Sequence, residues 1–430
     1  MHGPGHEFSH IIKIKQIEAP MAEHHHQILI IGGGMVGMTM AKAARDLGLT
    51  TAMLEPSPAS VTLAPEHDGR ASAIAFATSR MLDALGVWQH VAHEASPIED
   101  IMITDGKSRG MTSPMHIHFD HRDIGETPLG HIVENRHMRM ALQKVLEDAG
   151  HLHVEDQLAD LDLSGPKARV TTKKGEVHVA DLLVAADGHA SPSRGHAGIV
   201  MDGHDYSQHA LVFTVHLADG HDQVAHEHFL EQGPLAVLPM THSRANIVWT
   251  LNEQHARDLE ELGAAFINEE LQEALGQTFG KITIETKIWR YPLRLRMARQ
   301  YGRDNLVMIG DAAHAIHPIA GQGFNLGLRD VATLAELLQR QVKAGQEISG
   351  RGLLDDYETW RRQDCMVLGA VTHGVNGLFS NDLAPLRMAR DLGLGMVNRI
   401  KPLKQLFMRH AGGDMGDLPP LMRGQWTPTT

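Results

Sequence analysis

The segment QILIIGGGMVGMTMAKAARDLGLTTAMLE (residues 27–55) decides the fold. It opens with a short apolar run, passes through three glycines, and continues with apolar residues at the helical positions Val36, Met40, Ala44 and Leu47. A second short apolar run follows the turn that ends this helix. A helix between two buried strands brings the chain back to the end of the sheet at which the first strand began, so that the two strands run in the same direction. The pattern therefore predicts a parallel strand–helix–strand unit of a doubly wound sheet.

The glycines of this segment carry a nucleotide-binding pattern. Gly32, Gly34 and Gly37 form G-x-G-x-x-G, and Glu55 ends the next strand 23 residues after Gly32. The pattern alone is weak, but its place between a strand and a helix favours a dinucleotide with its pyrophosphate at the helix start and its ribose on the carboxylate. An acidic residue at this position suits an unphosphorylated adenosine ribose, as in FAD or NAD. The predicted binding residues in this segment are Gly32, Gly33, Gly34, Val36, Gly37 and Glu55.

The remaining chain alternates between helical and strand patterns. Residues 79–95, 136–149 and 328–342 have helical spacing, as have segments after Leu353. Strands are expected over 152–186 and, as an antiparallel sheet, over 208–250. Parallel α/β units therefore bracket an antiparallel sheet, and the predicted fold class is α/β.

Two further segments combine a strand end with polar or glycine residues. DLLVAADGHASPSR (181–194) is a strand ending at Asp187 and Gly188, although an Asp-Gly pair is also a frequent turn. GDAAHAIHPIAGQGFNLGLRD (310–330) follows a strand over 306–309, contains a glycine-rich loop, and becomes helical from Leu326. Such a junction exposes backbone N–H groups at the positive end of a helix.

Histidines in the second of these segments raise the alternative of a metal site. His314 and His317 are three residues apart, but Pro318 and the glycines interrupt any helix that would align them. Asp311 is the only nearby third ligand, so the sequence predicts no metal site.

Composition excludes several classes of protein. The net charge of −13 argues against a nucleic-acid surface, and the single cysteine, Cys365, excludes a disulfide framework or a cysteine zinc site. No apolar run reaches the length of a transmembrane helix, and the N-terminus lacks a secretory pattern. The expected location is the cytoplasm. We expect residues 1–23 to be a disordered extension, and order to be low at the tract His24–His26.

Taken together and in this order, the three motifs resemble those of FAD-dependent aromatic hydroxylases, the class A flavin monooxygenases of the para-hydroxybenzoate hydroxylase type. Further segments resemble the branch that hydroxylates polyprenylphenols in ubiquinone biosynthesis. These segments are residues 68–88, 129–142, 233–240, 291–295, 353–364 and 372–398, and the likeness spans roughly residues 27–424.

The resemblance assigns roles to individual residues. The first glycine loop and Glu55 would hold the ADP half of FAD, and Arg70 and Arg136 would lie near its pyrophosphate and ribityl chain. Asp187 and Gly188 would serve both flavin and nicotinamide cofactor, and Asp311 the ribityl or phosphate region. The segment Pro318–Asn325 would lie along the isoalloxazine ring, with Pro318, Gly321, Gly323, Phe324 and Asn325 as contacts and with His317 and Pro318 as the candidate catalytic positions.

The implied activity is that of an FAD-dependent monooxygenase which hydroxylates the ring of a polyprenylated phenol through a flavin hydroperoxide, with NAD(P)H as electron donor and O2 as co-substrate. Two alternatives stay open: a flavoenzyme of the same fold acting on another aromatic compound, and a non-catalytic flavin- or lipid-binding subunit of a biosynthetic complex. A polyprenylated substrate also implies contact with the inner-membrane surface or with such a complex. The basic and apolar segment 393–410 would provide this contact, unless it packs as an ordinary helix.

These expectations divide the chain into domains. The Rossmann-like FAD-binding domain would comprise residues 24–98, 134–200 and 293–342, with an inserted antiparallel substrate domain made of 99–133 and 201–292. Residues 343–430 would form a C-terminal helical region.

Overall fold

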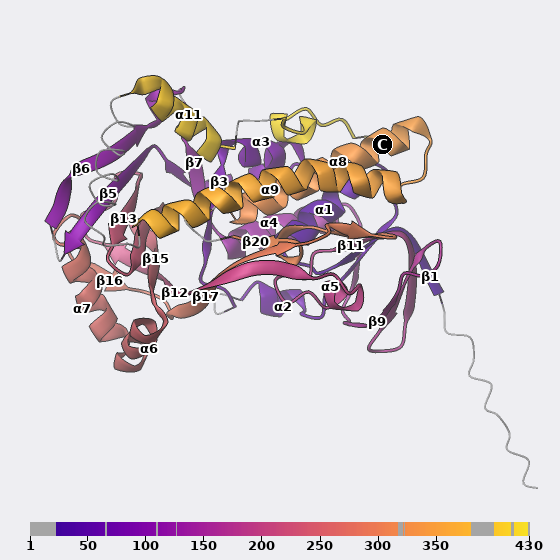
Figure 1. Cartoon of the computed structure of the whole chain (residues 1–430), viewed down its shortest axis with the longest axis horizontal. Coiled ribbons are helices and arrows are strands. Elements are labelled where there is room, and N and C mark those ends of the chain that lie inside the picture. Colours follow the sequence, from indigo (N-terminus) through magenta and orange to yellow (C-terminus); the bar gives the residue numbers. More distant parts are fainter. Residues whose placement is uncertain are drawn as a thin grey trace, which may run out of the picture.

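The computed structural model describes residues 23–428, apart from residues 65–66, 109–110, 126, 317–320, 322, 380–399 and 414–416. Strands in these described ranges form two large sheets toward opposite ends of an elongated molecule, and a small third sheet (Figure 1). The extension expected over residues 1–23 lies outside the described residues, except for Glu23, which begins the first strand.

The first large sheet has a parallel core. Strand β1 (Glu23–Ile31) pairs in parallel with both β2 (Thr51–Leu54) and β11 (Val177–Ala185). Residues Ile28–Ile31 are buried on both faces, as expected for a central parallel strand covered by helices. The strand order is β18–β19–β11–β1–β2–β8, with β10 and β9 added beside β11. The remaining members are β8 (Leu152–Val154), β9 (Leu158–Asp162), β10 (Ala168–Thr172), β18 (Gly302–Arg303) and β19 (Leu306–Met308).

Helix α1 (Met35–Asp46) connects β1 to β2 and confirms the predicted strand–helix–strand unit. It packs against α4 (Asn135–Asp148) and α8 (Gly323–Ala344). The apolar residues of α1 join those of β1 and α8 in the largest core cluster of the protein. This core fixes the glycine loop at one end of the sheet.

The second large sheet is mainly antiparallel. Its order is β20–β17–β12–β15–β14–β13–β5–β6, with β16 beside β12. One face packs against α6 (Glu253–Leu262) and α7 (Ala264–Leu275) in a separate apolar cluster. The strands are β5 (Asp100–Ser108), β6 (Met111–Asp120), β12 (Met201–Leu217), β13 (Val224–Leu230), β14 (Gly233–Met240), β15 (Arg244–Asn252), β16 (Ile282–Ile284), β17 (Trp289–Ala298) and β20 (His314–Ala315).

A three-stranded sheet joins the two halves. It consists of β3 (Ala71–Ala75), β7 (Gly130–Glu134) and β4 (Ser96–Ile98). Across the junction, Asn246 Nδ2 donates to the Gly69 carbonyl at 3.1 Å, and Arg244 pairs with Glu134 at 3.0 Å. These contacts turn the second face of the antiparallel sheet toward the glycine-bearing half.

The C-terminal part is helical, as predicted. Helix α9 (Arg351–Phe379) packs against α8 and runs from the parallel sheet toward the antiparallel one (Figure 1). Helix α11 (Lys401–Ala411) lies near β6, where Lys404 Nζ contacts Asp123 at 2.6 Å. None of the described helices is long and apolar enough to cross a membrane.

Three local predictions were wrong. Residues 79–95 are not one helix, because α3 (Phe76–Ala84) ends before Gly86, whose φ of +72° leaves the helical region, and two short 3-10 turns follow. Order is not low at His24–His26, since the tract pairs with β11 and His26 bonds to the His178 ring at 3.1 Å. The helix expected from Leu326 starts earlier, at Gly323.

The domain division stays a proposal. The expected boundary at 292/293 falls within β17, a strand of the antiparallel sheet. Strand β20, from the segment expected in the FAD-binding domain, also pairs with β17.

Candidate functional site

Four motif-bearing segments reach one edge of the parallel sheet. In register, Ile31 aligns with Leu54 and with Ala185, and Ala185 aligns with Met308. The residues that follow these strand ends are therefore neighbours: Gly32, Glu55, Asp187 and the Gly310–Asp311 turn. The carboxyl edge of a parallel sheet, where helices begin, is where α/β proteins place their nucleotide ligands.

The first glycine loop is closely packed on its protein side. Gly32 has φ +107°, and a Cβ there would lie 2.4 Å from the Ala186 carbonyl oxygen. A Cβ on Gly37 would lie 2.0 Å from the Gly32 carbonyl oxygen. Larger residues cannot occupy these positions without moving the backbone.

The same loop is open on its other side. A Cβ on Gly34 would meet no protein atom within 4 Å, although Gly34 caps α1. The N–H groups of the first turn of α1 point along this open end of the helix, where an anion is favoured. The loop therefore fits a pyrophosphate approaching the backbone closely.

Glu55 stands beside this loop as predicted from sequence. Its carboxylate accepts from the Gly33 N–H at 2.8 Å and from the Ser57 N–H at 3.0 Å. A carboxylate has about four lone-pair positions, so these two bonds leave capacity for hydroxyl groups of a ribose.

Val36 joins the two glycine-rich segments. A Cβ added to Gly310 would contact the Val36 side chain at 3.3 Å, and one added to Gly327 of α8 would lie 2.9 Å from it. Glycines at both positions let α1 and α8 approach each other. The side chain of Val36 therefore packs between the two motifs.

Asp187 organises its own turn. Its carboxylate accepts from the Ser191 hydroxyl at 2.6 Å and from the Ser193 N–H at 2.9 Å, at the start of α5 (Pro192–His196). Arg194, in the same turn, donates to the Ala312 carbonyl at 2.9 Å. The turn that contains Gly188 is thus fixed against the Gly310–Asp311 turn.

The two predicted arginines differ in their surroundings. Arg70 forms a pair with Asp68 at 2.9 Å and lies over the Tyr291 ring, 5.1 Å from its centroid. Although burial opposes the shift, hydrogen bonding to Asp68 raises the pKa of Arg70, and the Asp311 carboxylate adds to this effect. Arg70 therefore links the turn at Asp68 to Tyr291 of the antiparallel sheet.

Arg136 has an unused donor. Its guanidinium contacts the His137 ring at 2.9 Å, but its Nε is buried without a hydrogen-bond partner among the described residues. A buried donor without a partner costs about 1–3 kcal/mol, which a ligand acceptor would recover. This orphaned donor and the open loop at Gly34 fit a phosphate-bearing cofactor.

The third motif is only partly described. Its candidate catalytic positions, His317 and Pro318, lie outside the described residues. Gly321 lies against β3, since a Cβ there would be 3.0 Å from that of Ala73. Phe324 packs on the main core, and Gly323 begins α8 with open space around its Cβ position.

Asn325 uses its side chain to hold this region together. Its Nδ2 donates to the Ala73 carbonyl at 2.8 Å, and its Oδ1 accepts from the Ala75 N–H at 3.0 Å. The side chain is buried and bridges α8 to β3. Only its backbone N–H, at the helix start, is left to face a cofactor.

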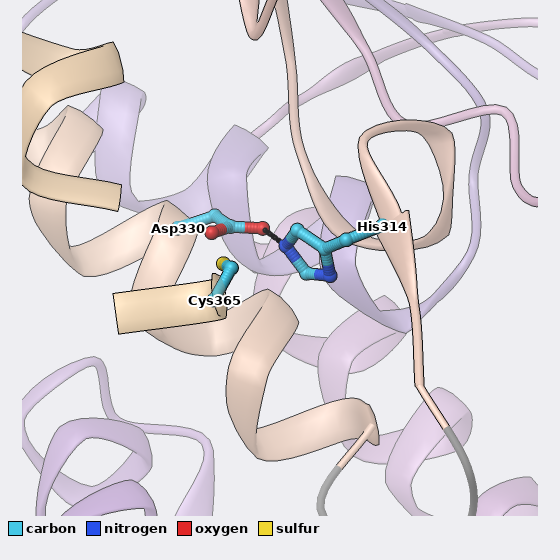
Figure 2. A group of neighbouring side chains, drawn as sticks. All are labelled: His314, Asp330 and Cys365. Atoms are coloured by element: carbon cyan, nitrogen blue, oxygen red, sulfur yellow. Dashed lines mark hydrogen bonds and ion pairs between the residues drawn. The ribbon is translucent and has the colours of Figure 1, made fainter. Parts of the chain in front are cut away.

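Sequence reasoning missed a buried charge cluster behind the third motif. His314, Asp330 and Cys365 meet there from three separate segments (Figure 2). Asp330 accepts from His314 Nε2 at 2.6 Å, from the Gly310 N–H at 2.8 Å, and from Arg361 Nε at 2.7 Å.

This cluster is an ion-pair network despite its metal-like set of ligands. Arg361 already provides a cation beside Asp330, and its guanidinium also contacts Cys365 Sγ at 3.5 Å. Although burial opposes it, the Asp330 carboxylate raises the pKa of His314, and the two cations outweigh burial to lower the pKa of Asp330. The helical pattern around Asp330 does not indicate these contacts, because Arg361 lies 31 residues further along the chain.

Comparison with known proteins agrees with this arrangement. The sequence matches the family described as "FAD binding domain" over residues 25–368. It is 40% identical to the ubiquinone hydroxylase UbiL of Rhodospirillum rubrum, over 92% of each chain. It is 31% identical to the 3-demethoxyubiquinol 3-hydroxylase of Escherichia coli K12, covering 91% of this chain and all of the relative.

The fold has close structural neighbours. The p-nitrophenol 4-monooxygenase PnpA of Pseudomonas putida DLL-E4 superposes with a TM-score of 0.77, covering 92% of this chain and 99% of that one at 19% identity. The PqsL protein of Pseudomonas aeruginosa superposes with a TM-score of 0.72 at 20% identity. The expected fold, a Rossmann-like half with an inserted antiparallel sheet, is therefore confirmed.

Proposed function

The chain belongs to the FAD binding domain family of flavin-dependent monooxygenases, and on that premise we propose that it hydroxylates the ring of a polyprenylated phenol on the route to ubiquinone. The observation that carries this proposal is the meeting of the three motifs, on four strand ends, at one sheet edge, which faces the antiparallel sheet across Arg70 and Tyr291. The substrate class rests on the hydroxylases to which the chain is similar over nearly its whole length.

Each part of the site has a task in this proposal. The loop Gly32–Gly34 and Glu55 hold the ADP half of FAD, and the free donor of Arg136 binds its phosphate or ribityl region. Asp311, which is exposed at the turn, accepts from ribityl hydroxyls. Gly188, Gly323 and Asn325 present backbone toward the flavin end. Bound FAD supplies the redox chemistry, with NAD(P)H as the electron donor and O2 as the oxygen source.

The residues around the flavin end stabilise charge and exclude water. The N-terminus of α8 at Gly323 has a partial positive charge, which favours the negative charge that a reduced flavin ring bears. Asn325 and Asp330 fix this helix start against β3 and the Gly310 turn. The backbone donors are therefore in place before the reaction, which lowers the cost of reorganisation.

Contact with a membrane surface is a further part of the proposal, since a polyprenylated substrate dissolves in lipid. The described part of α11 gives it limited support. Two of its lysines, Lys401 and Lys404, pair with Asp123 at 3.7 and 2.6 Å and so have less charge to offer to anionic lipid. The predicted contact segment is 393–410, and its residues 393–399 lie outside the described residues.

The test uses the purified full chain loaded with FAD. A phenol with a short prenyl chain should stimulate NAD(P)H oxidation, and isotopically labelled O2 should place one labelled oxygen atom on the ring, detected by mass spectrometry. Formation of hydrogen peroxide without labelled product would contradict the proposal. A chain that binds no FAD would contradict it at an earlier step.

A further inference from the structure

Glu227 is a carboxylate within an apolar row of the antiparallel sheet. It lies on β13, between Ile103 of β5 and Ala236 of β14. The row continues through Val248, Val212 and Trp289 on the next three strands. Because directly paired residues share a face, Glu227 is a single acidic side chain among apolar neighbours.

This face of β13 looks toward the flavin-binding half. Ala225, two residues before Glu227 and therefore on the same face, belongs to an apolar cluster with Ile132, and Ala73 of β3 packs against that cluster. Ala73 is the residue that Asn325 and Gly321 contact. The opposite face of the strand carries His226, whose ring lies 5.0 Å from that of Phe279 in the other apolar cluster.

The carboxylate has no partner within the described part of the chain. No hydrogen bond or ion pair connects it to another described residue, and it remains partly exposed, as do Val248 and Leu238 on the same face. Burial raises the pKa of Glu227 to about 7, with no neighbouring charge contributing. The charged groups that nearby elements turn toward this face are engaged elsewhere: Arg244 with Glu134, and Arg70 with Asp68 beside Tyr291.

A carboxylate that is partly removed from solvent and has no partner lowers stability, so its presence needs another explanation. An acid of raised pKa that faces a cofactor site is typical of a group that transfers protons. A phenol hydroxyl is the donor that such a carboxylate lacks. The apolar residues beside it match the ring and the prenyl chain of the proposed substrate.

Resting on the function proposed above, we propose that Glu227 binds the phenolic hydroxyl of the substrate and accepts its proton during hydroxylation. The phenol O–H bond breaks, the proton moves to a carboxylate oxygen, and the electron pair left on the phenol oxygen increases electron density at the ring carbons ortho and para to it. One oxygen atom of O2 joins such a carbon and the other leaves as water, with NAD(P)H oxidised. The hydrogen on that carbon is then lost as a proton when aromaticity returns, and the proton held by Glu227 goes back to the oxygen of the original hydroxyl, which leaves the carboxylate ionised for the next turnover.

The first test measures binding in the FAD-loaded protein. The probes are 2-prenylphenol and its methyl ether, which differ in the donated proton, and the readout is the change in flavin absorbance. Wild type should bind the phenol about tenfold or more tightly than the ether, because a hydrogen bond to a charged acceptor is strong. Glu227→Leu removes the acceptor, and the preference should fall close to one. An unchanged preference would overturn the proposal.

The second test measures kcat/KM for the phenol against pH, because this ratio reports the ionisation of the free enzyme. For wild type it should rise with an apparent pKa near 7 as the carboxylate forms. In Glu227→Gln, which accepts a hydrogen bond but cannot take a proton, kcat/KM should fall about a hundredfold or more and the rise should vanish. Glu227→Asp, which keeps a carboxylate, should restore part of the rate and part of the rise with pH.

Two matched variants control this result. Glu231→Gln changes an exposed carboxylate on the same hairpin and should behave as wild type. His317→Gln changes the histidine that the sequence offers as an alternative base. If the rise with pH vanishes in His317→Gln and persists in Glu227→Gln, the proposal is wrong.

The variants should fold, which keeps the tests decisive. The folded-state pKa of Glu227 lies above its ordinary value of 4.5, so its ionisation costs stability as the pH rises from 4.5 through about 7. Glu227→Gln should therefore be at least as stable as wild type at neutral pH.

The experiments distinguish failure of the proposed function from failure of the role proposed for Glu227. A wild type that hydroxylates no prenylated phenol contradicts the proposed function, whereas equal turnover of wild type and Glu227→Gln contradicts the role of Glu227 alone.

Discussion

His314 and Asp330 form a fully buried ion pair, with 2.6 Å between the imidazole Nε2 and a carboxylate oxygen (Figure 2). The same carboxylate accepts from the Gly310 N–H and pairs with Arg361 of α9. Arg361 contacts Asp364, which in turn pairs with Arg329 of α8. One buried side chain therefore connects the Gly310–Asp311 turn to the two long helices.

We expect Asp330→Asn to lower both stability and FAD affinity. Removal of one partner from a buried ion pair costs about 3–5 kcal/mol, because the remaining charges stay buried without compensation. Urea denaturation of the apoprotein measures the first effect, and titration with FAD the second. Lys144→Gln breaks an exposed pair with Asp148 on α4 and should cost less than about 1 kcal/mol. Similar unfolding midpoints for the two variants would show that the network does not stabilise the fold.

The same pair predicts how stability depends on pH. The pKa of His314 is raised well above 6.5 in the folded protein, so the native state keeps a proton that the unfolded chain releases. The contribution of His314 is therefore complete below 6.5 and decreases as the pH rises toward the folded pKa. The free energy of unfolding of wild type, relative to that of His314→Gln, should decrease as the pH rises above about 6. A difference that stays constant or grows over this range would show that His314 is neutral when folded.

Local patterns were sufficient to predict the cofactor half of the molecule. The apolar run 27–31, the three spaced glycines and Glu55 are close in sequence, and their contacts depend on strand and helix geometry alone. The order of four strand ends at one edge follows from parallel pairing, which brings Asp187 and Asp311 beside the loop, and their contacts with the cofactor stay predictions.

Contacts between distant segments could not be predicted. The partners of Asp330 include a residue 31 positions away, and the side chain of Asn325 bonds to β3, 250 residues earlier. Glu227 was missed for a different reason, since an alternating strand is expected to turn its polar residues to solvent. The alternation of Ala225, Glu227 and Phe229 did contain a signal, because it sets an acidic residue between apolar ones on the same face.

Gly34→Ala tests whether the first glycine loop binds the cofactor. The added Cβ would meet no protein atom within 4 Å, so the unfolding midpoint of the apoprotein should not change. It would occupy the space in which a pyrophosphate approaches the backbone, and FAD affinity should fall about tenfold or more, or about 1.4 kcal/mol. Gly352→Ala, at an open position in the first turn of α9, is the matched control and should leave FAD affinity intact. Wild-type affinity in Gly34→Ala would place the pyrophosphate elsewhere.

Asn325→Asp tests whether the start of α8 is positioned through β3. The variant replaces the Nδ2 donor by a carboxylate oxygen facing the Ala73 carbonyl, which should cost about 1–3 kcal/mol of stability for the lost buried hydrogen bond. Because Gly321 and Gly323 precede this helix turn, its displacement should also weaken FAD binding, measured by equilibrium titration.

The chain contains a matched control for this variant. Asn268 of α7 holds β16 by the same pair of bonds, from Nδ2 to the Ile282 carbonyl and from the Ile284 N–H to Oδ1, each at 3.1 Å. Asn268→Asp should therefore lower stability to a similar degree while FAD affinity stays at the wild-type value. The difference between the two variants separates a general loss of stability from the position of the cofactor loop. Equal FAD affinity in both would mean that the bond from Asn325 to β3 does not position the loop for FAD.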